Sequence, residues 1–108
     1  MFARILQFEV KPDVQKEFIK VIKNKVLPIL REQPGFLEIL PFFPEKSPEK
    51  TAFNISLWTT PANAERYARE TYPKVLEIVK PFLATPVTVK FLTLETTLCE
   101  RFVDSLAA

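Results

Sequence analysis

The fold of this chain is decided by one stretch, Thr51–Ala68, which reads TAFNISLWTTPANAERYA. The part up to Trp58 alternates as a β-strand does, in which successive side chains point to opposite faces. The apolar residues at 53, 55 and 57 share one face, and Asn54, Ser56 and Trp58 share the other. We expect the first face to enter a core and the second to suit the wall of a ligand cavity.

A helix is predicted to follow this strand directly. Thr60 can cap its N-terminus with a side-chain oxygen, and Pro61 fits the first helical position. Tyr72-Pro73 should interrupt the helix, because the residue before a proline disfavours helical geometry. Apolar residues then continue at helical spacing to the stretch Pro81–Pro86.

A longer helix is predicted before the strand, from about Asp13 to Glu32. Asp13 suits the N-cap position. Pro28 removes an amide donor and should bend the helix, but the apolar pattern persists beyond it, which favours one bent helix over two. Gly35 is the only glycine of the chain and follows this helix, where a positive φ is most useful.

The segment Phe36–Phe43 is apolar on both faces and predicts a strand covered on both sides. Simple alternation places Phe36 and Phe42 on the same face. Pro41 cannot donate to a neighbouring strand, so it indicates an edge strand or a bulge. The charged loop Pro44–Lys50 should join two antiparallel strands as a hairpin, with a mobile lid as the alternative.

The first and last strands complete the pattern. Phe2–Val10 alternates, and Thr85–Leu98 is a long run rich in β-branched residues. The apolar parity of the last run changes between Phe91 and Leu92, which predicts a bulge there. The order β-α-β-β-α-β is that of the ferredoxin-like split βαβ fold, an α+β domain with a four-stranded antiparallel sheet and both helices on one face.

The other face of this sheet needs a cover. Ile5 and one side of Phe36–Phe43 are too apolar to face water. A second copy of the chain is the simplest cover, because twofold homodimers are the commonest oligomers. We therefore expect a homodimer whose sheets face each other, a dimeric α+β barrel, with a cavity between each sheet and its helices.

Length and charge set further bounds. The chain has 108 residues, enough for one domain, which we place at residues 1–98. The tail, residues 99–108, is too short for a domain, but its apolar side chains could dock on the partner subunit. These side chains are Phe102, Val103 and Leu106. The net charge is only +2 and the signs are interleaved, so nucleic acid is not an expected partner.

Neither a membrane span nor secretion is expected. No apolar run approaches the ~20 residues of a membrane-spanning helix, and the N-terminus lacks the pattern of a signal peptide. The lone cysteine, Cys99, rules out an intrachain disulfide and suggests a reducing compartment. We expect a cytoplasmic protein.

The chain contains no histidine. This excludes Ser–His–Asp and Cys–His catalysis, His-ligated zinc or non-haem iron, and His-ligated haem. Proton transfer would fall to Asp, Glu, Lys or Tyr side chains, or to the ligand itself. No metal site is predicted.

Several short motifs occur in a characteristic order. Arg4–Val10 is followed by Lys11-Pro12, the sequence QPGF stands at 33–36, and ISLWT at 55–59 precedes a helix with AERY at 64–67. Together they resemble the antibiotic biosynthesis monooxygenase (ABM) domain family, a branch of the dimeric α+β barrels, over residues 1–98. The resemblance implies the same ferredoxin-like fold and the same sheet-to-sheet homodimer that the strand and helix patterns predict.

The family includes cofactor-free oxygenases of aromatic polyketides, haem-degrading enzymes and members without an established activity. In the polyketide oxygenases an Asn and a Trp four residues apart on the third strand line the cavity, and Asn54 and Trp58 match this pair. A Tyr and an Arg of that cavity have no clear counterpart, because Tyr67, Tyr72 and Arg66 lack the matching spacing. The haem-degrading branch is excluded, because its haem-ligating histidine is absent.

The resemblance implies a monooxygenase of small aromatic, quinone-like or polyphenolic compounds that needs no cofactor. A phenolic substrate would lose a proton and pass an electron to O2, while the protein binds, orients and shields it. Trp58 would stack on the ring, and Asn54 would hydrogen-bond a phenolate or carbonyl oxygen. Gln7 and Ser56 would add polar contacts, and Glu9 could act as a base if it were desolvated.

Each of these residues has a plain structural alternative. Trp58 and Asn54 could serve packing or the dimer contact, and the two polar residues of the first strand could lie at the surface or interface. Tyr67 and Tyr72, which we also consider as substrate contacts, could be core residues with a solvated hydroxyl. The alternative function is a non-catalytic homodimer that binds a small apolar molecule or supports another protein.

Overall fold

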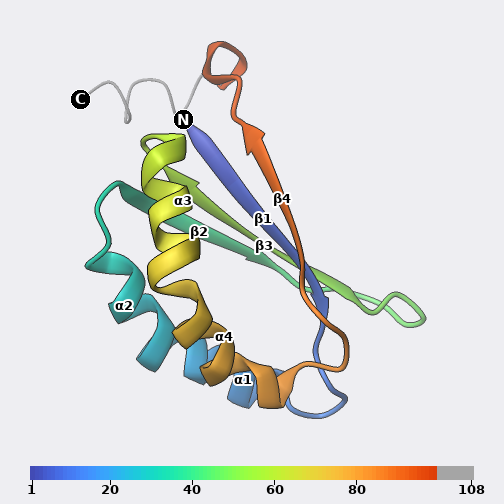
Figure 1. Ribbon diagram of the computed structural model, residues 1–108. Coiled ribbons are helices and arrows are strands. Elements are labelled where there is room, and N and C mark those ends of the chain that lie inside the picture. The colour runs from blue at the N-terminus through green and yellow to red at the C-terminus, as the bar shows by residue number, and fades with distance from the viewer. Residues whose placement is uncertain (100–108) are drawn as a thin grey trace.

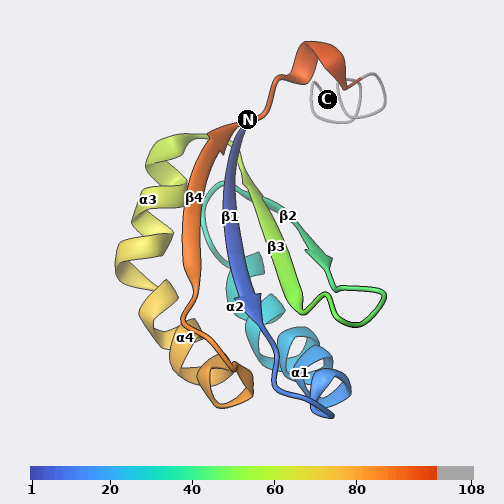
Figure 2. The ribbon, with the colours of Figure 1, turned by 90° about the vertical axis from the view of Figure 1, so that its right-hand side faces the viewer.

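Four antiparallel strands form one sheet in the order β2-β3-β1-β4 in the computed structural model, which describes residues 1–99. The strands are β1 (Phe2–Glu9), β2 (Phe36–Phe42), β3 (Thr51–Trp58) and β4 (Thr88–Thr93). The helices lie against one face of this sheet (Figure 1, Figure 2). The predicted α+β, ferredoxin-like split βαβ topology is confirmed, with β3 at the predicted bounds and beside β1 in the centre of the sheet.

The first helical region runs as three consecutive segments: α1 (Gln15–Val21), the π-helical turn η1 (Ile22–Val26) and α2 (Leu27–Arg31). Pro28 helps to explain the wide turn, because it has no amide to donate to the carbonyl four residues back. The Leu27 amide donates to the Ile22 carbonyl, five residues back. One bent helical region is confirmed, but Asp13 is not its cap, since it has a φ of 65° and Val14 takes the cap position without a side-chain bond.

The second helical region comprises α3 (Pro61–Glu70), α4 (Tyr72–Val79) and the short 3-10 turn η2 (Lys80–Phe82). The hydroxyl oxygen of Thr60 accepts the backbone amide of Asn63 at 3.2 Å, so the predicted cap is confirmed. Thr71 leaves helical geometry at a φ of −120° and separates α3 from α4. The predicted interruption is therefore present one residue before Tyr72.

An irregular register in β2 changes which side chains face the helices. The pairing with β3 shifts between Phe36 and Glu38, so that simple alternation fails at this point. Phe36 packs edge-on against Trp58, with ring centroids 5.6 Å apart, whereas Phe42 is 55% exposed. Our assignment of Phe36 and Phe42 to one face was wrong because a one-residue shift reverses the parity of a strand. The edge position that Pro41 predicted is confirmed.

The last strand is shorter than predicted and carries no bulge at the expected place. Its pairing with β1 is regular from Thr88 to Thr93, and residues 96–98 form a 3-10 turn, η3 (Thr96–Leu98). Phe91 and Leu92 are 47% and 53% exposed, so the change of parity reflects an edge strand with apolar side chains on both faces. The tail was predicted to dock on a partner subunit. Apart from Cys99, its residues lie outside the described range.

The core lies between the sheet and the helices, on the face that Ser56 and Trp58 share. Phe53 and Ile55 point the other way and line a hollow on the outer face of the sheet. The expectation that the residues at 53, 55 and 57 enter a core is therefore wrong within one subunit for Phe53, which is 39% exposed, whereas Leu57 is buried. Burial of Ser56 and Trp58 on this face is possible because the indole N–H of Trp58 donates to the Ser56 hydroxyl.

Gly35 joins α2 to β2 with a φ of 77° and offers a direct test of this turn. A Cβ atom at this position would overlap the side chain of Asn63 and lie 2.6 Å from Oγ1 of Thr59. We expect Gly35→Ala to lower the free energy of unfolding by about 2 kcal/mol, from backbone strain and this clash. Urea unfolding followed by circular dichroism measures the loss, with exposed Pro34→Ala as the control. An unchanged midpoint would contradict this account of the turn.

Candidate functional site

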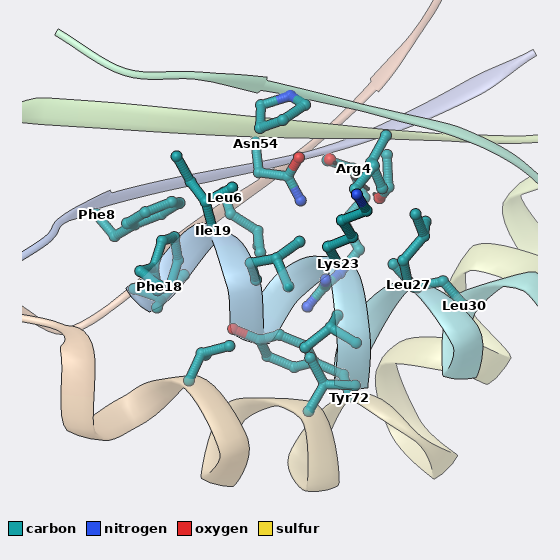
Figure 3. A pocket seen from close by; sticks show the side chains of 18 of the residues that line it. Arg4, Leu6, Phe8, Phe18, Ile19, Lys23, Leu27, Leu30, Asn54 and Tyr72 are labelled. Atoms are coloured by element: carbon teal, nitrogen blue, oxygen red, sulfur yellow. Dashed lines mark hydrogen bonds between the residues drawn. The ribbon is translucent and has the colours of Figure 1, made fainter. Parts of the chain in front are cut away.

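A cavity of about 320 Å³ lies between the helices and the helix-facing side of the sheet. Most of its wall is apolar, and its polar members come from five different elements (Figure 3). These polar members are Arg4 on β1, Lys23 on η1, Asn54 and Ser56 on β3, Tyr67 on α3 and Tyr72 on α4. A mostly apolar hollow with a few converging polar groups is typical of a small-molecule site.

Strand register brings the polar groups of the sheet together. Arg4 pairs with Ser56, and Leu6 pairs with Asn54, so these side chains project from neighbouring strands toward the helices. The break between α3 and α4 places Tyr67 close to Tyr72, with ring centroids 6.2 Å apart. The polar groups of the cavity wall are therefore held by helices and strands.

Trp58 is completely buried and does not line the cavity. Its indole N–H donates to Oγ of Ser56 at 2.9 Å, and its ring stacks on Tyr67 at a centroid distance of 5.0 Å. The Ser56 hydroxyl in turn donates to the backbone carbonyl of Arg4 at 3.3 Å. The predicted position of Trp58 on the wall was wrong, because Tyr67 lies at the wall and Trp58 supports it from behind.

The sequence analysis missed two polar residues of the cavity wall, Lys23 and Arg4. Arg4 is the buried one of the two. It is only 3% exposed, and its Nε atom is buried without a hydrogen-bond partner. The guanidinium carbon lies 3.9 Å from the ring centroid of Tyr72 and 5.5 Å from that of Tyr67. A signal was present, since Arg4 has the same strand parity as Leu6 and Phe8 and so places a charge on the core-facing side.

Burial controls the ionisation of this cluster. It lowers the pKa of the Arg4 guanidinium, while the two phenols act in the opposite direction. It raises the pKa of Tyr67 and of Tyr72 above the ordinary value of 10.0, against the opposing effect of Arg4. Both tyrosines are therefore neutral at pH 7, and Arg4 brings a positive charge into an apolar environment.

Asn54 lies on the cavity wall and points from β3 toward the helices (Figure 3). Its Oδ1 atom is buried and has no hydrogen-bond partner. An unsatisfied buried acceptor costs stability, and a ligand hydroxyl is a group that could satisfy it. Asn54 thus has the position and the free hydrogen-bonding capacity of a ligand contact.

Two other predicted site residues lie elsewhere. Gln7 lines the hollow on the outer face of the sheet, so its predicted place in the cavity was wrong. Glu9 follows it at the end of β1 and is not part of the cavity wall, although its backbone amide donates to Oγ1 of Thr85 at 3.1 Å. Alternation along β1 sends both side chains away from the helix-facing side.

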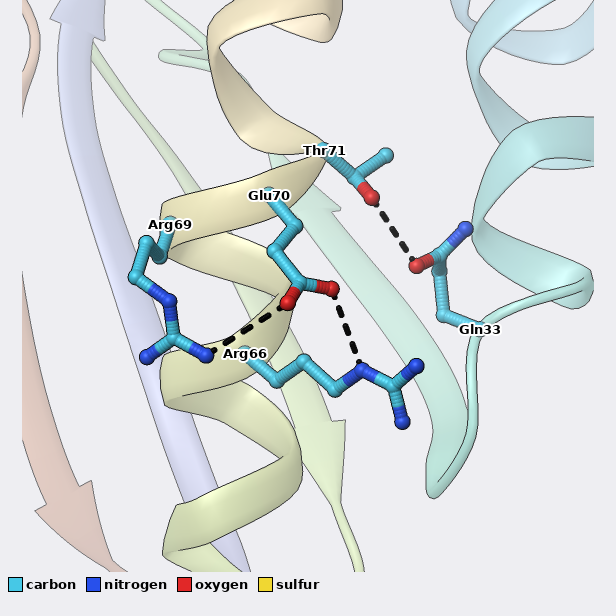
Figure 4. Close-up of polar contacts among 5 residues, drawn as sticks. All are labelled: Gln33, Arg66, Arg69, Glu70 and Thr71. Carbon is cyan, nitrogen blue, oxygen red and sulfur yellow. Dashed lines mark hydrogen bonds and ion pairs between the residues drawn. The ribbon is translucent and has the colours of Figure 1, made fainter.

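Arg66 also lies away from the cavity. It forms an exposed ion pair with Glu70 at 3.1 Å on the surface of α3, and Arg69 approaches the same carboxylate at 3.5 Å (Figure 4). Beside this cluster, the Thr71 hydroxyl donates to Oε1 of Gln33 at 3.1 Å. This bond links the break between α3 and α4 to the end of the first helical region.

Residues 1–99 contain no group of three or more His, Cys, Asp or Glu side chains placed to hold a metal ion. In the same range, no helix is long and apolar enough to cross a membrane.

Known structures share this fold. The monooxygenase from the gene ActVA-Orf6 of Streptomyces coelicolor, solved with the ligand nanaomycin D, is similar with a TM-score of 0.68 and 22% identity, over 87% of each chain. SnoaB, a cofactor-independent oxygenase from Streptomyces nogalater, gives a TM-score of 0.69 and 18% identity, over 90% of this chain and 95% of that one. At these identities the likeness shows the fold alone.

Sequence comparison assigns the family. No curated protein sequence matches the chain. The family model described as antibiotic biosynthesis monooxygenase matches residues 1–74, which include β1 to β3 and the tyrosines of the cavity wall. The chain therefore belongs to the antibiotic biosynthesis monooxygenase (ABM) family.

Proposed function

We propose that this protein is a cofactor-independent monooxygenase of small aromatic, quinone-like or polyphenolic compounds. The observation that carries the proposal is the cavity of about 320 Å³, which is mostly apolar and has Asn54 on its wall. Membership of the ABM family supports oxygen chemistry as the use of this cavity. The structural likeness to two monooxygenases is consistent with it but shows the fold only.

The proposed reaction draws its electrons from the substrate. A hydroxyarene loses its hydroxyl proton, and the electron-rich anion reduces O2. One oxygen atom bonds to a ring carbon, and the other leaves as water with two hydrogens of the substrate. A naphthol and O2 thus give a naphthoquinone and water, and the equation balances without a further reductant.

The protein contributes binding, orientation and exclusion of water. Apolar side chains of the sheet and helices surround the ring, and Tyr67 and Tyr72 add aromatic surface to the wall. Asn54 orients the substrate through a hydrogen bond to an oxygen substituent. Trp58 acts indirectly, since it fixes Tyr67 by stacking.

Asn54 gives the test of this function. We expect Asn54→Ala to lower the rate of substrate-dependent oxygen uptake by about 100-fold, the loss that misplacement of a substrate at the reacting centre can cause. An oxygen electrode with a panel of naphthols and dihydroxyaromatics measures the rate. The matched control is Asn24→Ala, because Asn24 is exposed and lies outside the cavity wall.

The same experiment separates the proposal from a binding role without turnover. Oxygen uptake that no panel member raises above the buffer rate would remove the support for an oxygenase. The open cavity would then support a binder of small apolar molecules in preference to a purely structural protein.

The assembly we propose is a homodimer through the outer faces of the sheets. Phe42, Phe53 and Leu92 are between 39% and 55% exposed and line one hollow with Ile5 and Ile55. Apolar side chains grouped in this way favour a protein contact. The cytoplasm is the proposed compartment, on the ground that a single cysteine offers no intrachain disulfide.

A further inference from the structure

The charges on the cavity wall are all of one sign. Arg4 and Lys23 line the cavity, and no carboxylate of the described residues does. Lys23 is exposed and can remain hydrated, but Arg4 is 3% exposed. A buried charge is costly unless it is paired, and one without a counter-charge is unusual in a protein interior.

The surroundings of Arg4 compensate its charge only in part. The faces of Tyr72 and Tyr67 attract the guanidinium, at 3.9 Å and 5.5 Å from their centroids. These rings are neutral, and Nε keeps no hydrogen-bond partner. The cavity thus retains a positive charge and an unused donor, and an anion is the species that would neutralise both.

We propose that the cavity binds aromatic ligands that carry a single anionic oxygen group, and that Arg4 is the residue that holds this group. The aromatic part follows from the wall, which contains Phe8, Phe18 and Phe43 beside the two tyrosines. We infer a single negative charge on the ligand, because one buried guanidinium neutralises one negative charge. A dianion would require a second buried cation, and Lys23, the other charge of the wall, is exposed.

The binding site does not depend on turnover, but its link to oxygen chemistry rests on the proposed function. A phenol bound beside Arg4 would ionise more readily, since a neighbouring positive charge favours the anion. Its proton would pass to bulk water as the anion binds. The anionic form is also the form that reduces O2 in the proposed reaction, so Arg4 would favour the reactive species.

The test compares an acid with its neutral amide. We expect the wild-type protein to bind 2-naphthoate at least about tenfold more tightly than 2-naphthamide, as one charge-assisted pair would give. Fluorescence of Trp58 reports binding, because it is the only tryptophan of the chain and stacks on Tyr67 at the cavity wall. This titration needs no oxygen uptake, so a failure of the oxygenase proposal would not affect it.

Variants at Arg4 assign the preference to this residue. Arg4→Met keeps an unbranched side chain without the charge and should bind the acid and the amide equally. Arg4→Lys keeps the charge and should retain part of the preference. The control is Arg66→Met, which removes an exposed arginine on α3 and should leave the ratio unchanged. Circular dichroism of each variant establishes that it is folded.

A second probe distinguishes the two sources of the anion. The ionised form of 4-nitrophenol absorbs visible light, and we expect the wild-type protein, but not Arg4→Met, to raise its ionised fraction at neutral pH. A preference for naphthoate alone would assign the site to carboxylates, and a shift of nitrophenol alone would assign it to phenolates. Equal binding of naphthoate and naphthamide with no nitrophenol shift, or a preference that survives in Arg4→Met, would overturn the inference.

Discussion

Replacing Trp58 with alanine is expected to lower the free energy of unfolding by about 4 kcal/mol, in the range observed for large aromatic residues removed from a core. Trp58 is 0% exposed and packs between Phe36, at 5.6 Å, and Tyr67, at 5.0 Å. Alanine would leave an empty space behind Tyr67. It would also remove the indole N–H that donates to the Ser56 hydroxyl. Because whole domains are stable by only about 5–15 kcal/mol, this loss would remove a large share of the total.

A matched variant separates volume from hydrogen bonding. Trp58→Phe keeps most of the aromatic volume and loses the indole donor to Ser56, so we expect a smaller loss of about 1–2 kcal/mol. Urea unfolding must be followed by far-ultraviolet circular dichroism, because both variants lack the only tryptophan. A loss below about 1 kcal/mol for Trp58→Ala would show that Trp58 does not support the wall as described.

Replacing Ile55 with glutamate is expected to convert the proposed homodimer into a monomer at micromolar concentration. Ile55 lies in the middle of β3 and lines the outer hollow with Phe53 and Leu92. In a twofold interface the same surface patch meets itself, so each substitution introduces a carboxylate on both sides. Burial of these unpaired charges costs several kcal/mol, which is enough to shift a micromolar equilibrium fully.

Light scattering coupled to gel filtration measures this change. The wild-type protein should elute with twice the chain mass of 12.5 kDa, and Ile55→Glu with the single mass. The control is Ala62→Glu, which adds the same charge at an exposed position on the helical side. A monomeric wild type, or a dimer that Ile55→Glu leaves intact, would contradict the proposed interface.

Local signals in the sequence were sufficient for the topology. The alternation of Thr51–Trp58 gave β3 at its observed bounds, and Thr60 with Pro61 gave the start of α3. Each of these signals acts within a few residues, through backbone geometry or a side-chain cap. The element order and the edge position of β2 followed from such signals combined.

The composition of the candidate site depended on longer-range geometry. Which strand face the helices cover is decided by packing, and it put Gln7 outside the cavity and Arg4 inside. The shift after Phe36 depends on pairing with β3, which alternation within β2 does not report. Trp58 occupied the expected face, yet whether Tyr67 or Trp58 reaches the wall is set by the helix that lies across them.

The π-helical turn affects the direction in which side chains of the first helical region point into the cavity. Phe18, Ile22, Val26 and Leu30 recur every four residues, and all four line the cavity. On a regular α-helix this spacing would drift around the axis by about 40° at each step. The wider turn at Ile22–Val26 absorbs part of this drift, so Val26 and Leu30 keep the same azimuth toward the sheet and are each only 4% exposed. The helical phase at this turn therefore decides which side chains of the first helical region face the sheet across the cavity.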